Sequence, residues 1–330
     1  MILVVIGHVV DFNALLCTMP AAFRMPFFFV IAGFFLNLSK WGASENFRPF
    51  VTKLFKRMII PYFIANLLWY PIWFVACHKA GLLGYSFWGW TKILPFDALT
   101  AIFIGNANGT GLVLIPLWFL PALFFAEIIF VVLWNRLNKF GAKIFVLAVV
   151  IFSCFGFNVK NFVSLWFDVD IALVALIFLL AGILIRKYNF VDRIDLKIFV
   201  GLTAIVLGAF FFNEHIDMNF RIYGNAFLFY AGGIAGSLLV MKISMLAVKV
   251  RGKFIALIED CGRQTMLILV LHPIIANIFY EIIVRAADIP PENLFVEPTI
   301  IFFATIFGTL IPLWIAKRFG KLPVLKHFCA

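Results

Sequence analysis

The fold of this chain is decided by residues 1–36, which read MILVVIGHVVDFNALLCTMPAAFRMPFFFVIAGFFL. The segment begins as an apolar helix that contains one histidine, His8, three residues before one aspartate, Asp11. Residues three apart share a helix face, so Asp11 is placed to hold the His8 imidazole in one tautomer. A short polar turn follows, and residues 24–35 form a second apolar run. If these runs cross a membrane, their ionisable side chains point to function.

The composition indicates a membrane protein. Of the 330 residues 64% are hydrophobic and 13% are charged, against about 25% charged residues in soluble domains. So large an apolar excess has to face lipid, and the 43 phenylalanines suit such contacts. The net charge of +11 does not indicate nucleic-acid binding, because the basic residues gather in short clusters between apolar runs. The five cysteines lack metal-binding or disulfide spacing and are expected to be free thiols.

Ten apolar segments predict an all-α, polytopic protein with about ten transmembrane helices in a single membrane domain, residues 1–330. Alternate loops hold most of the basic residues, which places both chain ends in the cytoplasm. Residues 91–105, in the longest outward loop, are apolar but too short to cross. The ten segments are roughly 1–16, 25–38, 58–77, 116–134, 143–157, 165–185, 198–212, 222–241, 264–284 and 298–316.

Five stretches carry a resemblance to a known family. They are GHVVDF (7–12), RMPFFFVIAGFF (24–35), KLFKRMIIPYF (53–63), LWFLPALFFAE (117–127) and LILVLHPII (267–275). In this order they resemble the successive motifs of the membrane acyltransferase 3 family, the integral-membrane O-acyltransferases that modify bacterial surface sugars. The fourth stretch is most similar to fucose 4-O-acetylase-like members. The resemblance covers nearly the whole chain.

This resemblance implies transfer of an acyl group, most simply acetyl, from cytoplasmic acyl-CoA to a hydroxyl of a surface or lipid-linked saccharide. It implies His8 as the catalytic base with Asp11 beside it, because a neutral imidazole can take the proton of a weak nucleophile near neutral pH. An acyl-histidine intermediate is possible but not required. Acyl-CoA is then a donor substrate, and no permanently bound cofactor, no metal and no nucleic-acid partner is expected. The location implied is the bacterial inner membrane, in contact with lipid.

The family pattern also places an arginine eleven residues before the catalytic histidine, a position that falls before Met1. Either the chain lacks this arginine or, as we expect, the first helix is truncated at its N-terminus and the natural reading frame extends upstream. The charged cytoplasmic flank expected of a first transmembrane helix is missing as well.

Four further residues are candidates for donor and substrate contacts. Lys53 and Arg57 either bind the phosphates of CoA or act as a topology signal that contacts anionic lipid. Glu127 is a costly carboxylate in the middle of a span, with Trp118 at the start of that span. We expect Glu127 either to make a structural hydrogen bond or, with Trp118, to contact substrate.

Two more candidates lie close to prolines. His272 precedes Pro273 within a span, and it either caps the helical turn that the proline breaks or orients the acceptor or thioester. Arg24 is expected at the outer turn before Pro26, where it either pairs with Asp11 or binds substrate. Four glycines predict close helix packing rather than a nucleotide loop: Gly224, Gly232, Gly233 and Gly236.

Two other function classes remain as alternatives. A proton-coupled transporter would use His8, Glu127 and His272 as a relay, but the chain shows no paired halves with matching broken helices. A purely structural membrane partner would not need so many polar side chains within its spans.

Overall fold

The computed structural model describes residues 2–9, 15–75, 93–105, 112, 114–159, 165–250, 252–287, 297–322, 325 and 328–329. The chain forms two compact units. Unit 1 comprises Met1–Cys17, Ile60–Leu117 and Arg251–Ala330, and unit 2 comprises Thr18–Ile59 and Trp118–Val250. Each unit is assembled from stretches that lie far apart in the sequence. The single membrane domain expected over residues 1–330 stays a prediction.

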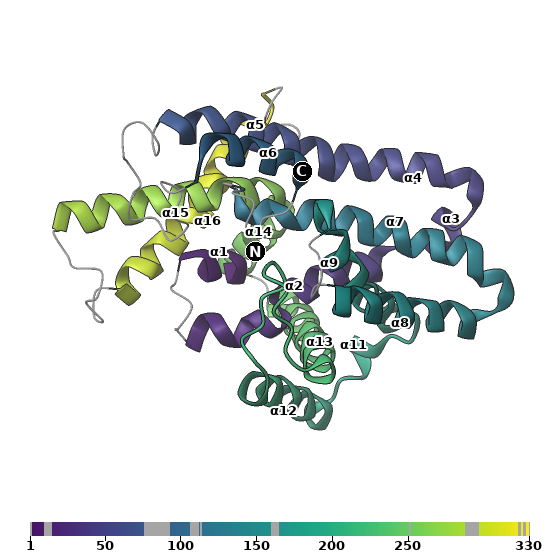
Figure 1. The fold of residues 1–330 in the computed structure, drawn as a ribbon. Helices are drawn as coiled ribbons and strands as arrows, with labels where there is room; N and C mark the ends of the chain where they lie inside the picture. The colour runs from purple at the N-terminus through teal and green to yellow at the C-terminus, as the bar shows by residue number, and fades with distance from the viewer. Residues whose placement is uncertain are drawn as a thin grey trace. The chain divides into compact units, whose positions relative to one another are not determined.

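Helices make up both units, which confirms the all-α fold (Figure 1). Within the described residues the only β-type pairing is an isolated bridge between Asp217 and Ile222. Unit 1 contains α1 (Ile2–Val9), α5 (Ile60–Trp73), α6 (Pro95–Ile104), α14 (Lys253–Arg263), α15 (Thr265–Ala287) and α16 (Glu297–Phe319). Unit 2 contains nearly all of α2 (Leu15–Phe35), then α3 (Leu38–Trp41), α4 (Phe47–Leu54), a π-helix η2 (Phe55–Ile59), α7 (Phe119–Leu137), α8 (Ala142–Val159), η7 (Trp166–Asp168), α9 (Val169–Val174), α10 (Leu176–Lys187), α11 (Phe190–Arg193), α12 (Leu196–Phe212) and α13 (Ala226–Val250).

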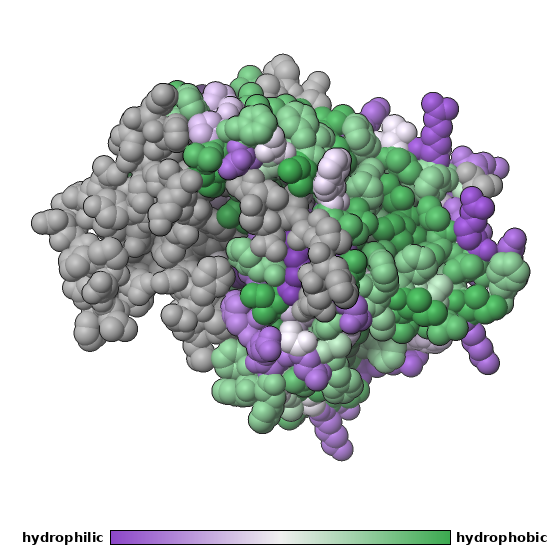
Figure 2. Space-filling view, viewed as in Figure 1, coloured by the Kyte–Doolittle hydropathy of each residue, from purple (hydrophilic) through white to green (hydrophobic). Residues whose placement is uncertain are grey.

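Several helices have the length and apolarity of membrane spans. Among the described residues these are Ile115–Phe140, which includes α7, then α8, α13 and Phe302–Phe319 of α16, and the bent pair η7/α9 and α10 would add a fifth. Figure 2 shows a broad apolar surface over the part of unit 2 that contains α7 and α8. The chain is therefore a polytopic membrane protein. Helices cover part of every predicted segment, but a count of about ten spans stays a prediction.

The bent span in unit 2 has a visible cause. Its two parts meet at an angle of 50°. The Val174 carbonyl, at the bend, accepts hydrogen bonds from Ser153 Oγ at 2.8 Å and from the Tyr230 hydroxyl at 3.2 Å. A broken helix is tolerated in an apolar medium when neighbouring side chains satisfy the freed backbone groups. The break is therefore stabilised by α8 and α13.

Glycines allow helices of unit 2 to approach closely. A Cβ on Gly33 of α2 would overlap the Leu179 carbonyl of α10, and a Cβ on Gly182 would overlap the Val30 carbonyl. The predicted packing role is confirmed for three glycines of α13: Gly232, Gly233 and Gly236. It is wrong for Gly224, which lies in a turn with a φ of 61°, a backbone conformation that favours glycine.

Unit 1 is built around α15 and α16, and α1 packs against both. Its core includes Val5 of α1, Ile268 and Ala276 of α15, and Ala304 and Leu313 of α16. The apolar piece at residues 91–105 contains α6, whose ten residues are too few to cross a bilayer, as predicted.

Candidate functional site

An open groove in unit 2 gathers four basic side chains. It has a volume of about 720 Å³ and is lined by Arg48, Pro49, Thr52, Lys53, Lys56 and Arg57. These residues form two rows, spaced by four, along α4 and η2, so each row faces one side of the helix. The opposite face of α4 is held down by buried Phe50, whose ring lies 5.4 Å from that of Trp41. The basic groups are therefore presented on a fixed surface.

Two features orient these cations further. Lys53 Nζ lies 5.5 Å from the centre of the Trp41 ring, within the range of a cation–π interaction. Lys56 and Arg57 belong to the π-helix η2. π-helices are rare in proteins, and those that occur are often found at functional sites. Phe55 of the same π-helix packs its ring 6.4 Å from that of Phe124 on α7.

Glu127 of α7 lies close to this groove. Its side chain is buried, and the positive charges of Arg57 and Lys53 act on its carboxylate. The structure therefore brings together three residues that the sequence singled out separately, Lys53, Arg57 and Glu127. Since α7 packs against η2, the field of the cations reaches Glu127 in the interior of unit 2.

Trp118 lies where the sequence placed it, immediately before α7 begins at Phe119. It is buried, and its ring stands edge-on to that of Phe119. Phe119 in turn packs against Phe28 and Phe29 of α2. Nine residues of helix, or ~14 Å, separate Trp118 from Glu127, so the two residues do not share one contact surface.

The prediction that Arg24 lies at a turn is wrong. Arg24 lies within α2, which continues through Pro20 and Pro26. Proline is tolerated in such helices when neighbouring groups satisfy the freed carbonyls. The charge of Arg24 acts on Asp217, a partly buried residue of the loop between α12 and α13 whose pKa is raised by burial. Asp11, the partner considered from the sequence, lies outside the described residues.

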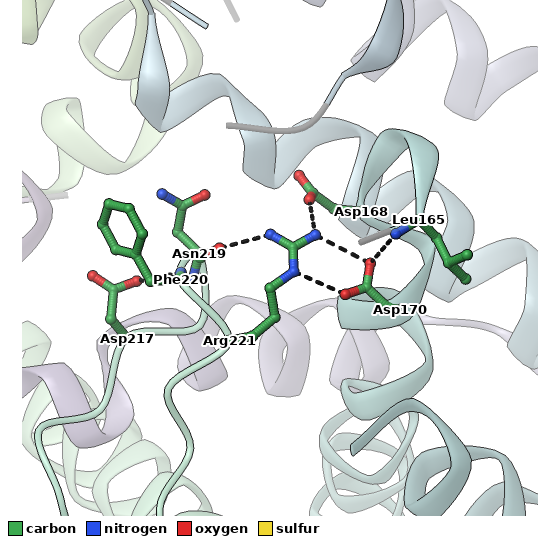
Figure 3. Close-up of polar contacts among 7 residues, drawn as sticks. All are labelled: Leu165, Asp168, Asp170, Asp217, Asn219, Phe220 and Arg221. Carbon is green, nitrogen blue, oxygen red and sulfur yellow. Dashed lines mark hydrogen bonds and ion pairs between the residues drawn. The ribbon is translucent and has the colours of Figure 1, made fainter. Parts of the chain in front are cut away.

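A buried ionic cluster near Arg24 was missed by sequence reasoning (Figure 3). Arg221 donates to Asp168 Oδ1 at 2.6 Å, and to both oxygens of Asp170 at 2.8 and 3.1 Å. All three side chains are almost fully buried. The one available signal was that Arg221 stands in a loop expected to face outward, where basic residues are few.

Unit 1 contains the two histidine candidates. His8 lies on α1, and its side chain lies outside what the structure describes. His272 on α15 is fully buried and lies 2.7 Å from the Ile268 carbonyl through Nδ1. A carbonyl only accepts, so Nδ1 carries a proton, and in a neutral ring Nε2 is then the acceptor. Pro273 leaves the Leu269 carbonyl without its helical donor, and this contact is to the neighbouring carbonyl, so the capping role of His272 stays a prediction.

Within the described part of the chain, no group of three or more His, Cys, Asp or Glu side chains is placed to hold a metal ion. Cys154, Cys261 and Cys329 are free thiols, as expected. Cys17 and Cys77 lie outside the described side chains.

Apolar helices that carry a cationic groove next to a buried carboxylate define a helical membrane protein with a strongly basic surface site. A family model described as an acyltransferase domain matches residues 1–317. The chain therefore belongs to the acyltransferase 3 family and is a membrane acyltransferase. A comparison with curated proteins and one with solved structures both found no match.

Proposed function

We propose that this protein is an O-acyltransferase that moves an acyl group, most simply acetyl, from cytoplasmic acyl-CoA to a hydroxyl of a surface or lipid-linked saccharide. The observation that carries the proposal is the groove with four basic side chains beside buried Glu127. Family membership favours acyl transfer over the proton-coupled transporter. The proposed location is the bacterial inner membrane, with both termini in the cytoplasm.

The groove suits the anionic part of an acyl-CoA. CoA carries three phosphate groups, and clustered lysine and arginine side chains are the usual means of binding them. Lys53 and Arg57 lie nearest to Glu127 and are the proposed phosphate ligands, while Glu127 accepts hydrogen bonds from the amide groups of the pantetheine arm. Because the groove belongs to a strongly basic loop, the positive-inside rule places it on the cytoplasmic side, where acyl-CoA is made.

The proposed chemistry uses His8 as a general base. The neutral imidazole takes the proton of the saccharide hydroxyl while the oxygen attacks the thioester carbonyl. The carbon–sulfur bond then breaks, the CoA thiolate takes the proton from His8, and an ester and free CoA are released. Asp11 holds the His8 ring in the required tautomer, His272 orients the acceptor or thioester, and Trp118 and Arg24 contribute to substrate binding.

The groove is tested with the variant Lys53→Gln/Arg57→Gln. The variant loses two charge-assisted contacts at an exposed site, which together amount to about 1.5–3 kcal/mol of binding free energy. A tenfold change in affinity corresponds to about 1.4 kcal/mol. We expect KM for acetyl-CoA to rise about 10- to 100-fold. The measurement is release of CoA thiol by purified enzyme, with de-O-acetylated surface polysaccharide from the native cells as acceptor.

A control variant outside the groove and a modified donor show whether the change in KM comes from the groove. Lys143 is an exposed lysine of α8 outside the groove, and Lys143→Gln should leave KM unchanged. Removal of the 3′-phosphate from acetyl-CoA should raise KM for the wild type and have little further effect on the double variant. An unchanged KM in Lys53→Gln/Arg57→Gln would exclude the groove as the donor site.

The base is tested with His8→Gln. This variant should insert in the membrane normally and yield no acylated glycan, as judged by mass spectrometry of surface saccharides. Full acylation by an inserted His8→Gln protein would refute the assignment of His8.

A further inference from the structure

Two buried side-chain oxygens in unit 2 accept no hydrogen bond from the described residues. They are Asp168 Oδ2 and Asn219 Oδ1. The two residues are 0% and 5% exposed, so water does not reach these atoms freely. A buried acceptor without a donor costs roughly 1–3 kcal/mol, and native proteins keep few of them. Two in one cluster indicate a place where a ligand supplies the donors.

Both residues are held by the same guanidinium. Arg221 Nη2 donates to Asp168 Oδ1 at 2.6 Å, and Nη1 donates to the backbone carbonyl of Asn219 at 2.7 Å. Asp168 therefore accepts from Arg221 through one carboxylate oxygen, and Asn219 accepts from Arg221 through its backbone carbonyl. In Figure 3 the Asp168 and Asn219 side chains both lie on the side of the guanidinium away from the Arg221 backbone. The Asp168 side chain and the Asn219 backbone are thus both fixed by Arg221.

The hydrogen-bonding capacity of the two open oxygens limits the chemistry of the ligand. Asp168 and Asp170 pair with the guanidinium of Arg221, and the charges of Arg24 and His215 act on Asp217. Asp168 Oδ2 and Asn219 Oδ1 are both acceptors. The complementary group therefore donates hydrogen bonds, as a sugar hydroxyl does and an ionised carboxylate or phosphate does not.

Exposed aromatic rings flank the open oxygens in sequence. Trp166 is 71% exposed and lies two residues before Asp168, and Phe220 is 42% exposed and follows Asn219 directly. Small-ligand sites commonly combine aromatic surfaces with a few fixed polar groups. The apolar face of a pyranose packs on such rings while its hydroxyls turn to the polar atoms.

We propose that Asp168 and Asn219 bind hydroxyls of the acceptor saccharide, a neutral sugar, at the end of unit 2 opposite to the basic loops. The inference rests on the proposed function for the identity of the ligand. The 217–222 turn is closed by two backbone hydrogen bonds of 2.9 Å between Asp217 and Ile222, and Arg221 ties it to Asp168 and Asp170. A sugar hydroxyl therefore has to reach the two oxygens past this turn while the ion pairs stay formed.

The test compares Asp168→Asn and Asn219→Ala with the wild type. Asp168→Asn keeps an oxygen for Arg221 and replaces the open acceptor by an NH₂ group, while Asn219→Ala leaves the backbone carbonyl that Arg221 uses. Binding of de-O-acetylated polysaccharide to the detergent-purified protein is measured by calorimetry without acetyl-CoA. The KM for the acceptor, the KM for acetyl-CoA and the midpoint of thermal unfolding are measured in parallel. The control is Glu214→Gln, an exposed acid in the same loop.

The expected result is an affinity for the polysaccharide at least tenfold weaker, a KM for the acceptor raised by a similar factor, and a KM for acetyl-CoA within twofold of the wild type. Glu214→Gln should behave as the wild type. The inference is overturned if the variants bind polysaccharide as the wild type does, or if they lose only thermal stability, which is what a purely structural cluster predicts. A wild type that binds polysaccharide but never transfers an acyl group would instead refute the proposed function.

Discussion

The close contact between α2 and α10 predicts that Gly33→Ala lowers the stability of the protein, by an amount that the structure allows us to estimate. In Gly33→Ala the new methyl group meets the carbonyl carbon and oxygen and the Cα of Leu179. These are backbone atoms, which cannot rotate away, so the two helices have to separate. At the same interface Arg186 Nη2 donates to the Leu36 carbonyl at 2.8 Å, and separation lengthens this hydrogen bond.

The expected loss is the sum of three effects. Overpacking of a close contact costs about 1–3 kcal/mol, and weakening the Arg186 hydrogen bond costs about 1 kcal/mol. The better helix propensity of alanine returns about 1 kcal/mol. Gly33→Ala should therefore lower the free energy of unfolding by about 1–3 kcal/mol. Gly182→Ala meets the Val30 carbonyl of the same interface, so the double variant should lose less than the two single losses added together.

The assay is unfolding of the purified protein in mild detergent, followed by intrinsic tryptophan fluorescence as SDS is added. Gly201→Ala on α12 is the matched control, because nothing lies within 4 Å of a Cβ at that position. It should leave stability unchanged or raise it by up to about 1 kcal/mol. If Gly33→Ala proves as stable as Gly201→Ala, the close approach of α2 and α10 is refuted.

Two further predictions concern single carboxylates. Asp217 Oδ1 accepts from the backbone N–H groups of Asn219 and Phe220, and burial raises the Asp217 pKa above its usual value of about 3.9. The wild type therefore loses stability as pH rises from about 4 through that raised pKa, whereas Asp217→Asn keeps both bonds without a buried charge. Thermal melts should show Asp217→Asn to be the more stable protein at pH 7 and equal to the wild type near pH 3, and the reverse order at pH 7 would contradict the cause given for the shift. Lys317→Ala removes an exposed 2.7 Å ion pair to Asp260 that lowers the Asp260 pKa. Its small destabilisation at pH 7 should vanish as pH falls below about 3.8, and a loss as large as that of Gly33→Ala would contradict the exposed geometry.

Local patterns in the sequence predicted where apolar helices begin and which charged side chains are unusual. The start of α7 after Trp118 follows from the apolar run that begins there. Lys53, Arg57 and Glu127 stood out because charged side chains are rare in this chain. Their proximity follows from the packing of α7 against η2, and no spacing in the sequence encodes that packing.

The cluster around Arg221 shows why the rest could not be predicted. Its ion pairs join Arg221 to Asp168 and Asp170, about fifty residues earlier, across two loops with no shared motif. The position of Arg24 was mistaken for a related reason. An arginine two residues before a proline favours a turn in isolation, yet α2 continues as a helix through both, and the charge of Arg24 acts on Asp217 in a distant loop of unit 2.

The two charged regions of unit 2 are opposite in sign, and this asymmetry bears on the proposed reaction. The groove on α4 and η2 carries four cations, whereas the Arg221 cluster has more carboxylates than guanidinium groups. An anionic donor is attracted to the groove and repelled from the cluster, and a neutral saccharide has no reason to prefer the groove. Each substrate of a transferase that takes its donor and acceptor from opposite sides of a membrane would thus be selected at its own site in unit 2, and variants at one site should change only one of the two KM values.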